Sequence, residues 1–373
     1  MENGLQDKII KGVNSLFEAE KQFLHTLTSH QSTRGNEQSA QDFIASELSE
    51  RGYEVDVWNV NVKDISHLPG FSPVIGDYTN AINVVGSHIS KTKKGRSLIL
   101  NGHIDVVPEG PLEMWDTPPF EPRIDNGWMY GRGVGDMKAG LAANLFALDA
   151  IRSAGFAPAA DVFFQSVVEE ECTGNGALAC LQRGYKADAA LISEPSDETL
   201  TSSQLGVIWF QVQLRGIPVH VERADTGSNA IKAAIPLITA LESLEKSWNK
   251  EKYKHPAYAS HHHPLNLNVG KIEGGDWASS VPAWCTFDVR MAVFPGIDLK
   301  LACNEIETCL LTAASENTFL RNNSPKITYH GFQAEGYSLL EHIKPETKIA
   351  INTLEKAHQE ITGSNLVHVP TTC

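Results

Sequence analysis

The stretch that decides the fold reads Ser-Leu-Ile-Leu-Asn-Gly-His-Ile-Asp-Val-Val-Pro and covers residues 97–108. Its apolar run, 98–100, is typical of a strand buried within a parallel sheet. The strand period of two places His103 and Asp105 on one face of the extended chain. The carboxylate can then orient an imidazole that binds a metal ion. As an isolated motif, the pair would more often be a buried His beside a loop cap.

Acidic residues also follow the other predicted strands of the first half of the chain. Asp136 lies in Gly-Arg-Gly-Val-Gly-Asp-Met-Lys (131–138), the triplet Glu169-Glu170-Glu171 follows the run 163–168, and Glu194 follows the run 189–192. Ligands collect at the carboxyl ends of strands in open α/β sheets, so we expect these side chains to converge. One imidazole with several carboxylates indicates zinc or a similar divalent ion. As an isolated feature, the triplet would more often be a solvated face.

Two domains are expected from the length of 373 residues and from a change in the pattern of predicted strands and helices near residue 207. Before residue 207, apolar runs alternate with helical segments (1–27, 139–154 and 177–183). This pattern predicts an α/β fold with a mostly parallel sheet of buried strands. From residue 207 on, strands at 207–214, 265–272 and 283–292 alternate with helices at 229–246 and 299–314, which predicts an α+β domain with antiparallel strands. A helix at 343–361 and a strand near Val367 predict a return to the first domain.

Composition excludes several classes of partner. The net charge is -14, and no basic stretch with interleaved aromatic residues suggests a nucleic-acid surface. No apolar tract is long enough to span a bilayer. The six cysteines lack tight spacing, which favours reduced thiols and a cytoplasmic location. The run His261-His262-His263 can chelate metal, although a solvated loop is the simpler interpretation.

Over essentially its whole length the chain resembles the dinuclear zinc hydrolases that include acetylornithine deacetylase, succinyl-diaminopimelate desuccinylase, aminoacylase and glutamate carboxypeptidase. The order and spacing of six motifs carry the resemblance: Asn-Gly-His-Ile-Asp-Val-Val-Pro (101–108), Trp115 with Pro119-Phe120, Tyr-Gly-Arg-Gly-Val-Gly-Asp-Met-Lys (130–138), Glu-Glu-Glu-Cys-Thr-Gly-Asn-Gly-Ala (169–177), Ser-Glu-Pro-Ser (193–196) and Gly-Ser-Asn-Ala-Ile (227–231). The resemblance implies a zinc-peptidase-like catalytic domain, residues 1–206 and 331–373, with an inserted dimerisation or lid domain, residues 207–330.

The resemblance also implies roles at a two-zinc site, where Co²⁺ or Mn²⁺ could substitute. His103, Asp136 and Glu194 would bind one zinc, and Asp136 would bridge to a second zinc held by Glu171. Glu170 resembles the general base and Asp105 the carboxylate that orients His103. A slip of one residue in counting the triplet would move the base to Glu169.

Three residues of the second domain match family positions that act on substrate. His220, in Gly-Ile-Pro-Val-His (216–220), resembles a His that reaches the active site of the partner in a homodimer; a half-buried His at a strand end is the alternative. Arg290 matches a position that binds a substrate carboxylate, which suits an Arg fork, or it makes a surface ion pair. Asn229 lies in the motif 227–231. Ser279-Ser280 replace a substrate-binding Asn, so the pocket is expected to differ.

The end of the chain departs from the resembled pattern. Residues 369–373 correspond to a strand after which the family continues to a second-zinc His, so we expect a truncated member. One zinc would then bind well and the other weakly, unless His358 or His368 substitutes.

The activity implied is hydrolysis of the amide bond of a small N-acyl amino acid, as in acetylornithine deacetylase. A carboxypeptidase or dipeptidase is the alternative, and a catalytically impaired fragment is the competing interpretation.

Overall fold

The structure is a computed structural model that describes residues 2–339 and 343–372. The chain forms two compact units. The first unit comprises Met1–Phe71, Gly76–Glu198 and Lys344–Asn365, and the second comprises Ser72–Ile75, Thr199–Ile343 and Leu366–Cys373. Within the described residues, none of the helices has the length and apolar character needed to cross a membrane.

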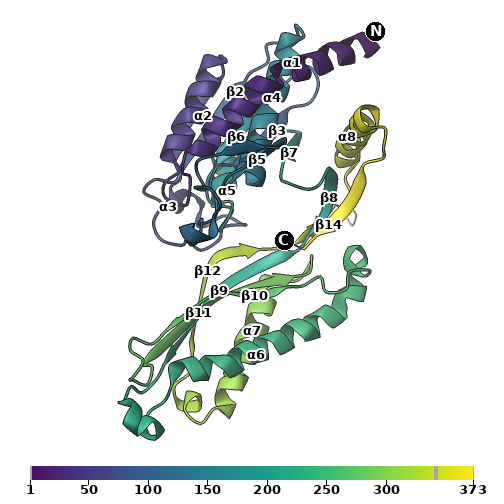
Figure 1. Cartoon of the computed structure of the whole chain (residues 1–373). Coiled ribbons are helices and arrows are strands. Elements are labelled where there is room, and N and C mark those ends of the chain that lie inside the picture. The colour runs from purple at the N-terminus through teal and green to yellow at the C-terminus, as the bar shows by residue number, and fades with distance from the viewer. Residues whose placement is uncertain (1, 340–342, 373) are drawn as a thin grey trace. The chain divides into compact units, whose positions relative to one another are not determined.

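A five-stranded sheet forms the centre of the first unit (Figure 1). Its order is β1 (Glu54–Asn59), β2 (Ile82–His88), β6 (Val162–Val167), β3 (Leu98–His103) and β7 (Ala189–Ile192). Strand β2 pairs antiparallel with both neighbours, whereas β3 pairs parallel with β6 and β7. Four strands therefore run in one direction, which confirms the mostly parallel sheet and places the carboxyl ends of β3, β6 and β7 along one edge.

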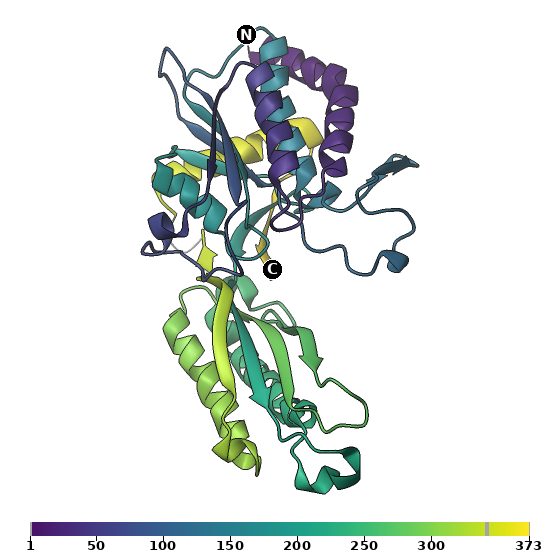
Figure 2. The same cartoon turned by 90° about the vertical axis from the view of Figure 1, so that its left-hand side faces the viewer.

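Helices cover both faces of this sheet (Figure 2). Leu48 of α2 (Gln38–Glu50) packs against Gly86 of β2, while the adjacent Val85 clusters with Cys180 of α5 (Asn175–Arg183). Successive side chains of a strand point to opposite faces, so α2 and α5 lie on opposite sides. The remaining helices of the unit are α1 (Glu2–Ser29), α3 (Val62–Ile65), α4 (Ala139–Ser153) and α8 (Pro345–Thr362), and β4 (Arg123–Asp125) pairs with β5 (Trp128–Tyr130).

Two glycines allow close backbone approaches beside the acidic residues. A Cβ on Gly140, at the start of α4, would collide with the backbone oxygen of Ser193, and a Cβ on Gly176, at the start of α5, would collide with that of Val168. The residues that follow these two carbonyls, Glu194 and Glu169, are therefore held against the starts of the two helices.

One expectation for the first unit is wrong. The apolar run 189–192 forms β7 as predicted, but Leu191 and Ile192 are 38% and 57% exposed instead of buried. The reason is position, since β7 lies at the edge of the sheet and pairs only with β3. An apolar run shows that a strand can be buried, and the topology decides whether it is.

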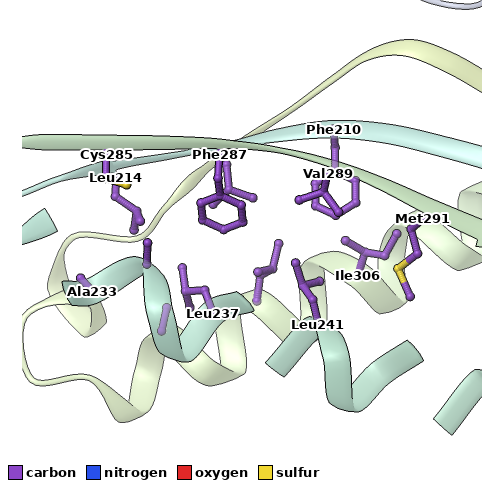
Figure 3. Packing of buried hydrophobic residues seen from close by; sticks show 14 of the residues in the cluster. Phe210, Leu214, Ala233, Leu237, Leu241, Cys285, Phe287, Val289, Met291 and Ile306 are labelled. Atoms are coloured by element: carbon purple, nitrogen blue, oxygen red, sulfur yellow. The ribbon is translucent and has the colours of Figure 1, made fainter. Parts of the chain in front are cut away.

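The second unit contains a four-stranded antiparallel sheet, as the pattern predicts. Its order is β10 (Leu267–Gly274), β11 (Trp284–Val293), β9 (Gly206–Arg215) and β12 (Lys326–Ala334). Every second residue of β9 is buried, so only one face of the sheet carries the core. Helices α6 (Ala230–Asn249) and α7 (Leu299–Glu316) cover that face, with Phe210, Phe287 and Leu241 among the side chains between the layers (Figure 3).

A smaller sheet of the second unit has the order β13 (Tyr337–Ser338), β8 (Thr199–Gln204) and β14 (Val367–Thr371). Strand β14 pairs in parallel with β8. It is therefore part of the second unit, whereas the sequence pattern predicts that the strand near Val367 returns to the first domain. The catalytic and dimerisation roles assigned to residues 1–206 with 331–373 and to 207–330 stay predictions.

Candidate metal centre

His103 is the last residue of β3 and is 1% exposed. Its Nδ1 lies 2.8 Å from the backbone oxygen of Asp105 and 3.7 Å from the Asp105 carboxylate. The nearer acceptor of an Nδ1 proton is thus the backbone carbonyl, although the sequence pattern points to the carboxylate. A proton on Nδ1 leaves Nε2 with a free lone pair, which is the form of imidazole that binds a metal ion.

Carboxylates from three other segments surround Nε2 of His103. The distances are 3.0 Å to Asp136 Oδ1, 3.7 Å to Glu194 Oε1 and 3.8 Å to Glu170 Oε2. Asp136 belongs to the turn before α4, Glu194 follows β7, and Glu170 follows β6. The carboxyl ends of the parallel strands therefore meet as predicted.

Two groups of side chains have the spacing to hold a metal ion. One group is His103, Asp136 and Glu171, the other is His103, Glu170 and Glu194, and within each group the ligand atoms lie within 4.8 Å of one another. The ligand set inferred from the resemblance pairs Glu194 with Asp136 and leaves Glu170 as the base, so the same residues occur in a different grouping. Among the described residues, neither group includes His358, His368 or the run 261–263.

Asp105 is 1% exposed and ties two parts of the site together. Its Oδ1 accepts the backbone N–H of Glu170 at 3.3 Å, and its Oδ2 accepts that of Glu171 at 3.1 Å. Complete burial raises the pKa of the Asp105 carboxyl. Through these two bonds the loop after β3 fixes the turn after β6.

Electrostatic repulsion within the cluster favours a cation. Burial and then the neighbouring carboxylates raise the pKa of Glu170 to about 8, and the same causes raise the pKa of Glu171 and of Glu194 to about 7. Burial lowers the pKa of His103, but the hydrogen bond to Asp136 and the surrounding carboxylates outweigh it and raise that pKa to about 10. One imidazole and several crowded carboxylates fit zinc or a similar divalent ion, whose charge would offset the repulsion.

Lys138 supports the turn that carries Asp136, a role that the sequence pattern does not reveal. Its side chain is fully buried, and Nζ donates to the backbone oxygens of Leu27 at 3.1 Å and His30 at 2.9 Å. Burial lowers the pKa of Lys138 to about 7. The only sequence signal was its place two residues after Asp136 in the motif 131–138.

The three other site candidates belong to the second unit. His220 is exposed, and its Nδ1 accepts the backbone N–H of Glu222 at 3.2 Å. Asn229 is the N-cap of α6, and Arg290 lies half-buried on β11. Asn229 and Ser280 both line an open groove of about 550 Å³ in this unit. The roles of these residues toward a substrate stay predictions.

The fold and the acidic edge around His103 are those of a metal-dependent hydrolase. Residues 99–372 match the model of the family described as Peptidase family M20/M25/M40. The chain belongs to this family.

Relatives in the family act on amides. The chain is 31% identical over 345 residues to an N-formyl-4-amino-5-aminomethyl-2-methylpyrimidine deformylase of Halalkalibacterium halodurans, covering 89% of this chain and 76% of the relative. It is 31% identical over 193 residues to a succinyl-diaminopimelate desuccinylase of Dechloromonas aromatica, covering 49% of each. These names support amide hydrolysis in general and do not single out acetylornithine deacetylase.

Solved structures confirm the fold. The di-peptidase Dug1p of Saccharomyces cerevisiae matches with a TM-score of 0.76 and 18% identity, over 100% of this chain and 88% of that chain. Human carnosine dipeptidase 1 matches with a TM-score of 0.73 and 15% identity, over 99% and 87%. At these identities the likeness concerns the fold alone.

Proposed function

We propose that this chain hydrolyses the amide bond of a small N-acylated amine, with an N-acyl amino acid as the leading substrate class. The observation that carries the proposal is the convergence of His103 and its carboxylates at the ends of β3, β6 and β7. Two relatives, the deformylase and the desuccinylase, are named for removing a small acyl group, which supports the same reaction.

The metal ligands of the proposed centre are His103, Asp136 and Glu194 for one ion, with Asp136 and Glu171 for a second. Zn²⁺ suits this donor set, and Co²⁺ or Mn²⁺ could replace it. When bound, such ions acidify water and polarise a carbonyl. Asp105 and Lys138 keep the protein side of the centre in place, since one holds the backbone at Glu170 and Glu171 and the other holds the turn at Asp136.

Glu170 is the general base in this proposal. It would take a proton from the attacking water and deliver it to the leaving nitrogen, because an amine leaves readily only after protonation. Position favours Glu170 over Glu169. The Glu170 side chain is half-buried and its carboxylate lies 3.8 Å from His103, whereas Glu169 is 2% exposed and paired with Arg34.

Residues 207–330 would form a dimerisation or lid domain, with His220 reaching the active site of a partner subunit and Arg290 and Asn229 contacting substrate. The exposure of the His220 side chain supports this role. Mixed dimers test it: inactive His220→Ala and Glu170→Gln chains should recover part of the activity when their subunits exchange. If proven heterodimers stay inactive, the role in trans is wrong.

A cytoplasmic location fits the proposal, because Cys172, Cys180, Cys285, Cys303 and Cys309 are all free thiols. Among oxidised proteins of the cell exterior, cysteines are more often paired.

A substrate panel tests the proposed reaction. N-formyl, N-acetyl and N-succinyl amino acids are incubated beside dipeptides with the purified chain, with and without a chelator. We expect cleavage of at least one N-acyl amino acid, loss of cleavage with chelator and recovery with added Zn²⁺. Cleavage of dipeptides alone would establish the peptidase alternative, and cleavage unaffected by chelator would contradict the metal centre.

A further inference from the structure

Glu169 differs from the two glutamates that follow it. Its side chain is 2% exposed, and its backbone has a φ of 67°, a left-handed conformation that a residue with a long side chain adopts only when its surroundings impose it. Neither candidate metal group includes Glu169. The proposed chemistry therefore leaves a buried carboxylate beside the site without a role.

Both carboxylate oxygens of Glu169 have partners. Oε1 forms an ion pair with Arg34 Nε at 2.5 Å. Oε2 accepts the hydroxyl of Tyr78 at 2.7 Å and that of Thr173 at 3.0 Å, and the Tyr78 hydroxyl in turn accepts an N–H from Asn175 at 2.8 Å. A charged, buried carboxylate with this many partners is fixed in one orientation.

The backbone of Glu169 is fixed as well. Its carbonyl oxygen accepts the backbone N–H of Thr173 at 3.0 Å and that of Gly174 at 2.8 Å. These bonds close the turn that leads into α5. Residues 170 and 171 lie within this closed turn, so their direction depends on the conformation at Glu169.

Arg34 connects this turn to the loop that follows His103 at the end of β3. The neighbouring Ser32 donates its hydroxyl to the Ile104 carbonyl at 2.7 Å, and its own carbonyl accepts the Val106 N–H at 3.0 Å. The ion pair between Arg34 and Glu169 thus joins the segment bound to the loop after β3 with the turn after β6.

We propose that Arg34, Tyr78 and Glu169 are positioning residues of the metal centre, which hold the turn at residue 169 so that Glu170 and Glu171 face His103. This inference rests on the proposed function, because it assigns to Glu171 the role of a metal ligand. Loss of a group that supports metal ligands typically lowers metal affinity or activity by about 10–100-fold.

The test is binding of Zn²⁺ to the chelator-treated full chain, measured by competition with a chromophoric chelator. Tyr78→Phe removes one hydroxyl and no charge, and Glu169→Gln removes the charge that pairs with Arg34. We expect both variants to bind Zn²⁺ at least about 10-fold more weakly than wild type. Tyr258→Phe is the matched control, because Tyr258 is a buried tyrosine of the second unit whose hydroxyl bonds the Thr371 carbonyl at 3.1 Å.

Thermal unfolding of each variant separates positioning from stability. If Tyr78→Phe and Tyr258→Phe lower the Tm equally and only Tyr78→Phe weakens Zn²⁺ binding, the positioning role is supported. Should Glu169→Gln fail to fold, Tyr78→Phe alone decides. Wild-type Zn²⁺ affinity in folded Tyr78→Phe overturns the inference while leaving the metal centre intact. Equal Zn²⁺ affinity of wild type and Glu171→Gln would instead overturn the assignment of Glu171 as a metal ligand and the inference with it.

Discussion

The two units bury different kinds of side chain. Among the described residues, every buried acidic or basic side chain lies in the first unit: Glu37, His103, Asp105, Lys138 and Glu169. The large core cluster of the second unit consists of apolar side chains from β9, β11, α6 and α7 (Figure 3). Burying a charge costs free energy unless partners compensate it, whereas burying apolar surface stabilises the fold directly.

This difference separates chemistry from stability. The first unit contains crowded carboxylates at the ends of β3 and β6, and a bound cation would balance their charge. The second unit has a sheet with one buried apolar face, and the burial of that face stabilises the fold. Changes to buried charges should therefore affect metal binding and turnover, and changes to the apolar core should affect unfolding.

The largest expected effect is that of Glu170→Gln. It should lower kcat by about 10²–10⁴-fold, because it removes a proton carrier and no proposed ligand. The bound Zn²⁺ per chain, measured by atomic emission, should stay unchanged. Glu273→Gln, an exposed glutamate of the second unit, is the control and should keep the full rate. A full rate in Glu170→Gln would move the base to Glu169.

Glu171→Gln should act on metal binding first. Loss of one carboxylate ligand should lower the affinity for one of the two Zn²⁺ ions. The loss should exceed the range of about 10–100-fold that is typical when a supporting group is removed. Stoichiometry by titration checks this against wild type. If the metal content is intact and only the rate falls, the roles of Glu170 and Glu171 must be exchanged.

A substitution in the core of the second unit should lower stability and leave metal binding unchanged. Phe287 is 1% exposed, and Phe287→Ala should lower the free energy of unfolding by about 3–5 kcal/mol because it leaves a cavity. Denaturant unfolding measures this loss, and Zn²⁺ affinity of the folded protein should equal that of wild type. Phe164 is fully buried in β6, the strand that leads to Glu170 and Glu171, so Phe164→Ala should cost a similar amount and also weaken Zn²⁺ binding. If Phe287→Ala and Phe164→Ala change the Zn²⁺ affinity equally, the proposed difference between the two units is wrong.

The sequence pattern anticipates elements whose signal is local. It places β3 so that His103 follows the apolar run, and it identifies the three acidic segments that converge on His103. It does not reveal Arg34 or Tyr78, because their partner Glu169 is distant in sequence and no local pattern links them. It also gives no sign that β7 lies at an edge, since a run of four apolar residues is the same in a central strand and an edge strand.

A smaller effect concerns Glu37, whose burial raises its pKa to about 7. An acid with a raised folded-state pKa is protonated in the folded protein and ionised in the unfolded chain between about pH 4.5 and 7, so its contribution to stability falls as pH rises through that window. A glutamine does not ionise, so Glu37→Gln removes this loss of stability at higher pH. The variant should match wild type near pH 5 and be more stable by about 2 kcal/mol at pH 8.

Denaturant unfolding at the two pH values measures the difference, with the exposed Glu18→Gln as control. If the Glu37→Gln variant is no more stable than wild type at pH 8, ionisation of Glu37 in the folded protein costs no free energy and the prediction is wrong.

The most direct test of the metal centre is a crystal structure of the zinc-loaded full chain with anomalous scattering recorded at the zinc edge. The account predicts an anomalous peak about 2.0–2.1 Å from Nε2 of His103, with a carboxylate oxygen of Asp136 at about 2.0–2.2 Å. An empty position beside His103, with zinc bound instead at the histidine run 261–263 of the second unit, would contradict it.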